Sequence, residues 1–61
     1  MQTLVKAKMF DGAEKTLSLN QQQLEYLIQE LDGALPFVAE LPTTEGELVL
    51  SMNVEHAEEV R

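Results

Sequence analysis

Few residues of this chain could carry out chemistry, and their spacing does not form a catalytic site. The one histidine, His56, stands among glutamates, and the sequence contains no cysteine. A metal site would therefore depend on carboxylates alone, and no Asp-x-Asp calcium loop is present. Ser18 and Ser51 have no base partner other than His56, and the adjacent Glu58 and Glu59 would point in different directions. We therefore expect no catalytic, cofactor-binding or metal-binding residues.

Charge is the most informative property of the composition. The 61 residues carry eleven Asp and Glu against four Lys and Arg, a net charge of −7. Residues 1–20 hold three lysines and two acids (+1), whereas residues 21–61 hold nine acids and one arginine (−8). An acidic body repels nucleic-acid phosphates and attracts basic protein surfaces, so we expect a basic protein partner and no direct nucleic-acid binding. The alternative is that the acidity serves only solubility.

The length predicts a single domain, residues 1–61, with a marginal hydrophobic core. No disulfide can support it, so self-association as a homodimer is the expected source of further stability. No apolar run approaches the length of a membrane span, and the N-terminus lacks the features of a signal peptide. We therefore expect a cytoplasmic protein without membrane contact.

Hydrophobic spacing predicts an α+β fold of order ββαββ, in which one helix packs on one face of a small antiparallel sheet. Residues 3–9 and 13–19 alternate like half-buried strands. A three-residue loop, 10–12, would set Val5 opposite Leu17 and Lys8 opposite Glu14, with Gly12 in the left-handed conformation. A two-residue loop would instead place the apolar sets of the two strands on different faces.

A helix is expected after Asn20, which forms an N-cap and a capping box with Gln23. Gly33 and Pro36 end it. Its apolar side, expected to face the sheet, consists of Leu24, Leu27, Ile28 and Leu31.

The C-terminal half predicts strands at 37–41 and 47–54. A four-residue loop, 42–45, would set Ala39 opposite Leu48 and would direct the even-numbered apolar residues inward, namely Leu48, Leu50, Met52 and Val54. The tail, residues 55–61, predicts either a short helix capped by Asn53 or an extended segment. We favour the extended segment, which would add a short fifth strand.

Some apolar and acidic groups remain outside this core and are candidates for binding. Tyr26 is expected on the outer face of the helix as an anchor for a partner, with Gln29 and Glu30 as neighbours. Glu25 and Asp32 are expected on one flank of the helix and Glu30 on the other, where they would give charge complementarity. Val38 and Val49 are expected opposite each other on the open face of the sheet, towards which Leu4 also points. We predict these three residues as a self-association surface.

Four segments together form a familiar pattern: Phe10-Asp11-Gly12, the strand 15–19, the helical segment 23–28 and the closing segment 52–57. This pattern resembles small acidic proteins of Gram-positive bacteria and their phages. Such proteins include phage-encoded inhibitors of host enzymes, among them acidic inhibitors of uracil-DNA glycosylase with a helix on a sheet. The resemblance implies a phage- or mobile-element-type inhibitor that occupies a basic, nucleic-acid-handling surface of a host protein. The alternatives are a homo-oligomeric accessory or structural protein and a small-molecule sponge.

Overall fold

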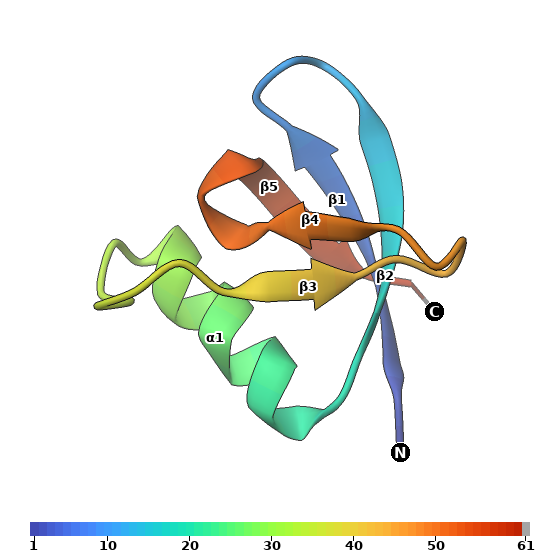
Figure 1. Ribbon diagram of the computed structural model, residues 1–61, viewed down its shortest axis with the longest axis horizontal. Coiled ribbons are helices and arrows are strands. Elements are labelled where there is room, and N and C mark those ends of the chain that lie inside the picture. Colours follow the sequence, from blue (N-terminus) through green and yellow to red (C-terminus); the bar gives the residue numbers. More distant parts are fainter. Residues whose placement is uncertain (61) are drawn as a thin grey trace.

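Two groups of antiparallel strands and one helix make up residues 1–60, the part of the chain that this computed structural model describes (Figure 1). The predicted α+β fold is confirmed. The elements follow in the order β1 (Thr3–Met9), β2 (Glu14–Leu19), α1 (Gln21–Leu31), β3 (Glu40–Pro42), β4 (Leu48–Leu50), the 3₁₀ turn η1 (Ser51–Asn53) and β5 (Val54–Glu59). The tail is extended, as favoured above, although residue 61 lies outside the described residues.

The β1–β2 hairpin has the predicted register. Val5 pairs with Leu17 and Lys8 with Glu14. The Met9 N–H donates to the Ala13 carbonyl at 2.8 Å, which closes the three-residue loop. Gly12 has a φ of +92°, a conformation that costs little only for glycine. The loop chemistry therefore fixes which side chains of both strands face the core.

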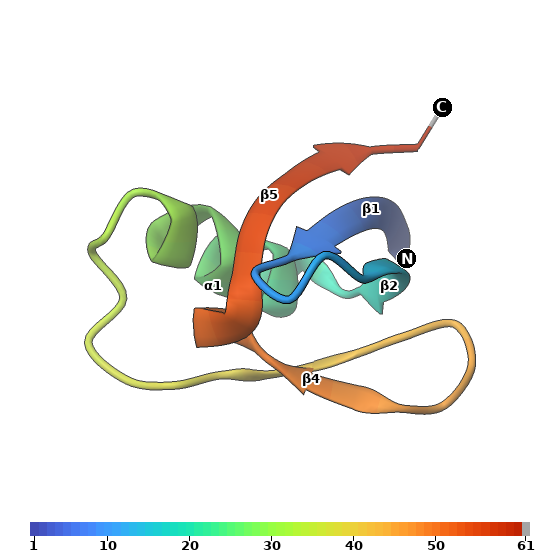
Figure 2. The same cartoon turned by 90° about the horizontal axis from the view of Figure 1, so that it is seen from above.

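β5 extends this hairpin on its other side, giving a three-stranded sheet of order β2-β1-β5. One face of β1 is buried and contributes Val5, Ala7 and Met9 to the core, whereas Lys6 and Lys8 lie on the exposed face. The core therefore lies on the side of the sheet that also carries the helix (Figure 2).

The ends of α1 are those that the sequence predicts. The Asn20 side chain accepts the Gln23 N–H at 2.8 Å, and the Gln23 side chain accepts the Asn20 N–H at 2.9 Å. At the other end Gly33 has a φ of +72°, and the Ala34 N–H donates to the Gln29 carbonyl at 2.8 Å. This bond belongs to a Schellman motif, which satisfies the last carbonyls of the helix.

The rotation of α1 about its axis differs from the prediction. Leu27 is buried, but Ile28 and Leu31 are 52% and 42% exposed. Tyr26 is not on the outer face: it is half-buried, packs against the core and meets the Phe37 ring edge-on, with centroids 5.0 Å apart. The helix contacts η1 as well as β2 and β5. Its buried side is consequently turned towards Tyr26 and away from Ile28.

The predicted register of the β3–β4 hairpin is wrong. Thr43 donates its N–H to the Glu47 carbonyl at 2.7 Å, so the loop is the three-residue segment 44–46, with Gly46 at a φ of +84°. Leu41 pairs with Val49. The register differs by three residues from the expected one, and an odd shift exchanges the two faces of a strand. Val49 is therefore buried, whereas Leu48 is exposed.

Residues 47–54 are not one strand. β4 ends at Leu50, and η1 turns the chain into β5, which belongs to the other sheet. An isolated bridge between Leu17 and Thr43 joins β2 to the β3–β4 hairpin, so the strands follow one another as β4-β3-β2-β1-β5. Figure 1 shows the hairpin crossing in front of the sheet. No helix within residues 1–60 is long and apolar enough to cross a membrane.

Candidate binding surface

A groove of about 210 Å³ lies between α1 and β5. Ile28 and Leu31, the two large apolar residues of the helix that the core leaves exposed, line it from one side. The rest of its lining is contributed by Val5, Leu24, Leu27, Ala57, Glu58 and Glu59. The apolar side of the helix is thus shared between the core and this groove.

The groove borders a strand edge that has no neighbour in the described part of the chain. β5 pairs only with β1, and the Val60 N–H donates to the Leu4 carbonyl at 3.0 Å. In an antiparallel pair successive residues turn their backbone groups to opposite sides. The N–H groups of His56 and Glu58 therefore face β1, and those of Ala57 and Glu59 face away from it.

Carboxylates lie in the groove and next to it. Glu58 and Glu59 line it from β5, and the exposed residues Glu25 and Asp32 directly follow the lining residues Leu24 and Leu31 in sequence. The ion pairs found within residues 1–60 join Lys6 to Glu14 at 3.5 Å and Lys15 to Glu47 at 2.6 Å. None of the four groove carboxylates takes part in these pairs, so their charge is directed to solvent.

The structure separates the residues predicted to bind a partner. Glu25, Gln29 and Asp32 are exposed on α1, but Tyr26 and Glu30 lie on the packed side of the helix. The prediction that Tyr26 and Glu30 lie beside Gln29 on the outer side of the helix is therefore wrong. Tyr26 is committed to Phe37 and to the core.

Glu30 has a structural contact that the sequence did not indicate. Its Oε1 accepts a hydrogen bond from the Ser51 hydroxyl at 2.7 Å, and the same hydroxyl oxygen accepts the Ala39 N–H at 3.0 Å. Ser51 is completely buried. This network ties α1 to η1 and to the segment before β3. Only the correct β4 register would have revealed it, because the expected register directed Ser51 outward.

The three residues predicted for self-association do not form one surface. Val49 is buried, while Val38, in the segment before β3, and Leu4, on β1, are 52% and 44% exposed. Val38 precedes β3 and does not pair with Val49, because the register places Leu41 there. The exposed apolar residues of β4 are instead Leu48 and Leu50, on its outward face.

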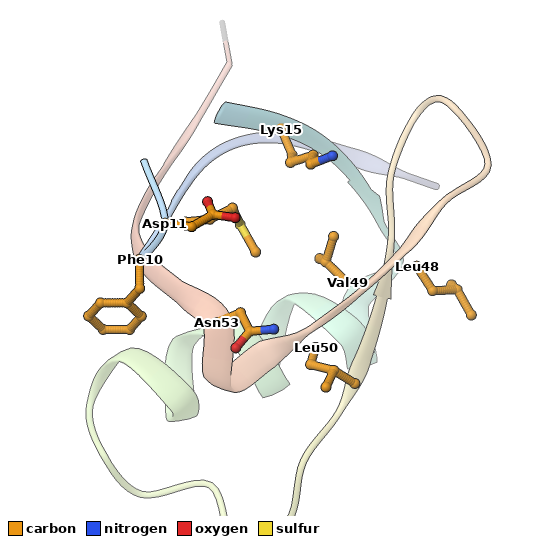
Figure 3. Close-up of a pocket in the computed structure, with 8 residues that line it drawn as sticks. Phe10, Asp11, Lys15, Leu48, Val49, Leu50 and Asn53 are labelled. Carbon is orange, nitrogen blue, oxygen red and sulfur yellow. The ribbon is translucent and has the colours of Figure 1, made fainter. Parts of the chain in front are cut away.

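A second hollow, of about 390 Å³, lies between the tip of the β1–β2 hairpin and β4. Figure 3 shows Lys15 and Val49 pointing into it, and Phe10 and Leu48 pointing away. The Lys15 ammonium bonds Glu47, and this hydrogen bond together with the nearby negative charge raises the pKa of Lys15 above its ordinary value of 10.5. Lys15 is thus engaged within the fold and is poorly placed to serve a ligand.

The exposed face of the three-stranded sheet alternates in charge. Lys6 pairs with Glu58 and Lys8 with His56 across β1 and β5. Within residues 1–60 no three His, Asp or Glu side chains gather into a group that could hold a metal ion. The groove between α1 and β5 is therefore the surface in which shape, charge and unpaired backbone coincide.

Comparison of the chain with family models, curated proteins and solved structures finds no match.

Proposed function

We propose that this chain is a non-enzymatic cytoplasmic binding protein that occupies a basic surface of a protein partner, in the manner of a phage- or mobile-element-type inhibitor. The observation that supports the proposal is the α1–β5 groove, whose lining includes Glu58 and Glu59 beside apolar side chains, with the exposed Glu25 and Asp32 next in sequence to its lining residues Leu24 and Leu31. Tyr26 and Glu30 no longer serve as contacts in this proposal, because both are held within the fold.

The two components of the groove have different roles in this proposal. Exposed carboxylates attract a basic partner over a distance and chiefly raise the association rate. Burial of the exposed apolar surface of Ile28 and Leu31 retains the complex after encounter, because apolar contacts removed from water supply most of the binding free energy. The same negative field disfavours direct contact with nucleic acid.

Charge substitution at the groove tests the proposal. The test variant is Glu25→Gln/Glu58→Gln/Glu59→Gln, and the control is Glu40→Gln/Glu45→Gln, which removes exposed charge away from the groove. The proteins are used to capture partners from host lysate at about 50 mM and about 500 mM salt, conditions that span weak and strong screening. Association rates are then measured with each purified partner.

We expect wild type and control to capture a basic protein at low salt. The groove variant should associate with it roughly tenfold more slowly, in line with the usual size of electrostatic steering. Equal association of the groove variant and wild type, or capture that is insensitive to salt, would contradict the proposal.

A second candidate function is self-association through β4. The outward side chains Leu48 and Leu50 are 58% and 41% exposed, and the strand carries no charge. An uncharged strand edge can pair with a second copy of itself. Sedimentation at micromolar concentration should show a dimer that Leu48→Lys converts to a monomer. A monomeric wild-type protein would exclude this candidate.

A further inference from the structure

We infer that the partner contributes an extended segment of alternating basic and apolar residues, which adds to the sheet as an antiparallel strand along the free edge of β5. This inference rests on the proposed function and specifies how the groove is used. The added strand would lie between β5 and α1, with its backbone on β5 and every second side chain against the helix. Recognition by strand addition combines backbone hydrogen bonds for affinity with side-chain pockets for specificity.

The backbone of β5 is prepared for this pairing. Ala57 and Glu59 direct their N–H and C=O groups away from β1, as the Val60–Leu4 bond and the alternation of antiparallel pairs require. No strand of residues 1–60 occupies that side. β5 is also long enough, with six residues, to offer a ladder of bonds.

The groove decides which side chains the added strand needs on its inner face. Ala57 pairs with the buried residue Ala7 and is itself half-buried, so it faces the helix side of the sheet. A residue directly opposite Ala57 would share that face and would meet Ile28 and Leu31 across the groove. Apolar residues fit these inner positions, because they would cover the apolar surface that α1 leaves exposed.

The neighbouring positions of the added strand face the other side of the sheet. There they would lie beside Glu58 and His56, which pair with Lys6 and Lys8 on that face. Lysine or arginine in the added strand would therefore lie beside the carboxylate of Glu58, and opposite charges on adjacent strands are stabilising.

The same charges argue against a second copy of this chain as the occupant. Antiparallel self-pairing centred on Ala57 would place Glu55 opposite Glu59 of the other copy. Like charges directly opposite each other destabilise a strand pair. Acidic edge strands are also a common protection against edge-to-edge association. Charge complementarity thus selects a basic strand and rejects an identical one.

A synthetic peptide of alternating lysine and valine, blocked at both ends, is a suitable probe. In antiparallel addition the residue opposite Ala57 turns both its side chain to the groove and its N–H to β5. The valine N–H groups should therefore bond β5, and the lysine N–H groups should face solvent. N-methylation of the valines removes the bonding donors, while N-methylation of the lysines is a matched control.

Binding is followed by NMR titration and by amide hydrogen exchange of the full chain. We expect the parent and lysine-methylated peptides to bind with similar affinity. The valine-methylated peptide should bind at least about tenfold more weakly, because the loss of each hydrogen bond lowers the affinity by roughly threefold to tenfold. Bound peptide should slow exchange at Ala57 and Glu59 and leave His56 and Glu58, which already face β1, nearly unchanged.

A pair of protein variants tests the side-chain part of the inference. Ile28→Ser should weaken binding of the peptide severalfold. Phe10→Ser, which alters an apolar side chain that is 68% exposed outside the groove, should leave binding unchanged. Both side chains are largely outside the core, so both variants should fold. Equal weakening by the two variants would contradict a site in the groove.

The outcomes separate this inference from the proposed function. If both methylated peptides bind as the parent does, strand addition is refuted while binding of basic partners stands. If only the lysine-methylated peptide fails, antiparallel addition with this alternation is refuted. If the lysine–valine peptide does not bind but a basic protein still depends on the groove carboxylates, strand addition is again refuted alone. If binding of the lysine–valine peptide and binding of a basic protein are both independent of the groove carboxylates, both proposals fail.

Discussion

The two outermost strands of the molecule, β4 and β5, have opposite chemistry although η1 alone separates them in sequence. β4 is Leu48–Leu50, a short edge without charge, with leucines exposed on its outward face. β5 is twice as long, carries three glutamates, and borders the apolar groove beneath α1. A neutral edge accepts a copy of itself, whereas an acidic edge accepts a basic strand.

This difference shows two ways in which a free strand edge can be protected against association with other chains. The shortness of β4 limits the number of hydrogen bonds that any added strand could form. The glutamates of β5 repel identical chains along a longer edge. Each edge is thereby protected against uncontrolled aggregation in its own way.

Substitutions that alter one edge at a time test whether β4 and β5 have independent binding properties. Leu48→Lys should abolish self-association and leave binding of the lysine–valine peptide within twofold of wild type. Ile28→Ser should weaken binding of the peptide severalfold and leave self-association unchanged. Sedimentation and NMR titration of both variants measure the two properties, and a variant that changes both would show that the edges are coupled.

Both edges depend on the turn that connects them, so Ser51→Ala should affect them together. The substitution leaves the Ala39 N–H without its partner and removes the donor to Glu30 in a buried site. We expect a loss of about 1–3 kcal/mol in the free energy of unfolding, the usual cost of an unsatisfied buried polar group. Urea denaturation measures it. Wild-type stability in this variant would mean that the network contributes nothing.

The hairpin that carries β4 can be weakened alone through Gly46→Ala. The left-handed conformation of Gly46 costs roughly 1 kcal/mol for alanine, although a Cβ there would meet no other atom. Gly12→Ala is the matched comparison, because that glycine occupies the same position of the β1–β2 loop with an equally open surrounding. Thermal unfolding should show similar losses, and no loss at Gly46 would argue against the three-residue loop.

The smallest expected effect concerns the Lys15–Glu47 pair, which links β2 to the start of β4. The pKa of Lys15 is raised by Glu47, so the folded state holds this proton more tightly than the unfolded state. The pair's contribution is complete below the ordinary lysine pKa and is lost as the pH rises through the higher folded value. When the pH is raised from neutral to alkaline, the melting temperature of Lys15→Gln should therefore fall slightly less than that of wild type. Thermal melts at the two pH values measure this difference.

The two hairpin loops show how far sequence reasoning reaches. Both are three-residue loops that end in a glycine of positive φ, Gly12 and Gly46. The prediction was correct for the first loop, where a two-residue loop would have placed the apolar sets of the two strands on different faces. It was wrong for the second, although the same glycine signal was present at Gly46, because both strands alternate and a four-residue loop also aligned their apolar sets.

The sequence predicted only part of the candidate site. Glu25, Gln29 and Asp32 are exposed as expected, because charged and amide side chains at the helix surface follow from the sequence pattern. The groove itself was not predicted. Its lining requires that Ile28 and Leu31 remain outside the core, and hydrophobic periodicity assigns both to the buried side.

The sequence by itself determined the features that depend on neighbours along the chain. The cap at Asn20, the stop at Gly33, the loop ending in Gly12 and the alternation of β1 all arise from local hydrogen bonds and backbone conformation. Tertiary structure alone decided the rotation of α1, the burial of Ser51 and the free edge of β5. Each of these depends on which distant segments pack together, since Tyr26 meets Phe37 and Glu30 meets Ser51 only after the chain has folded.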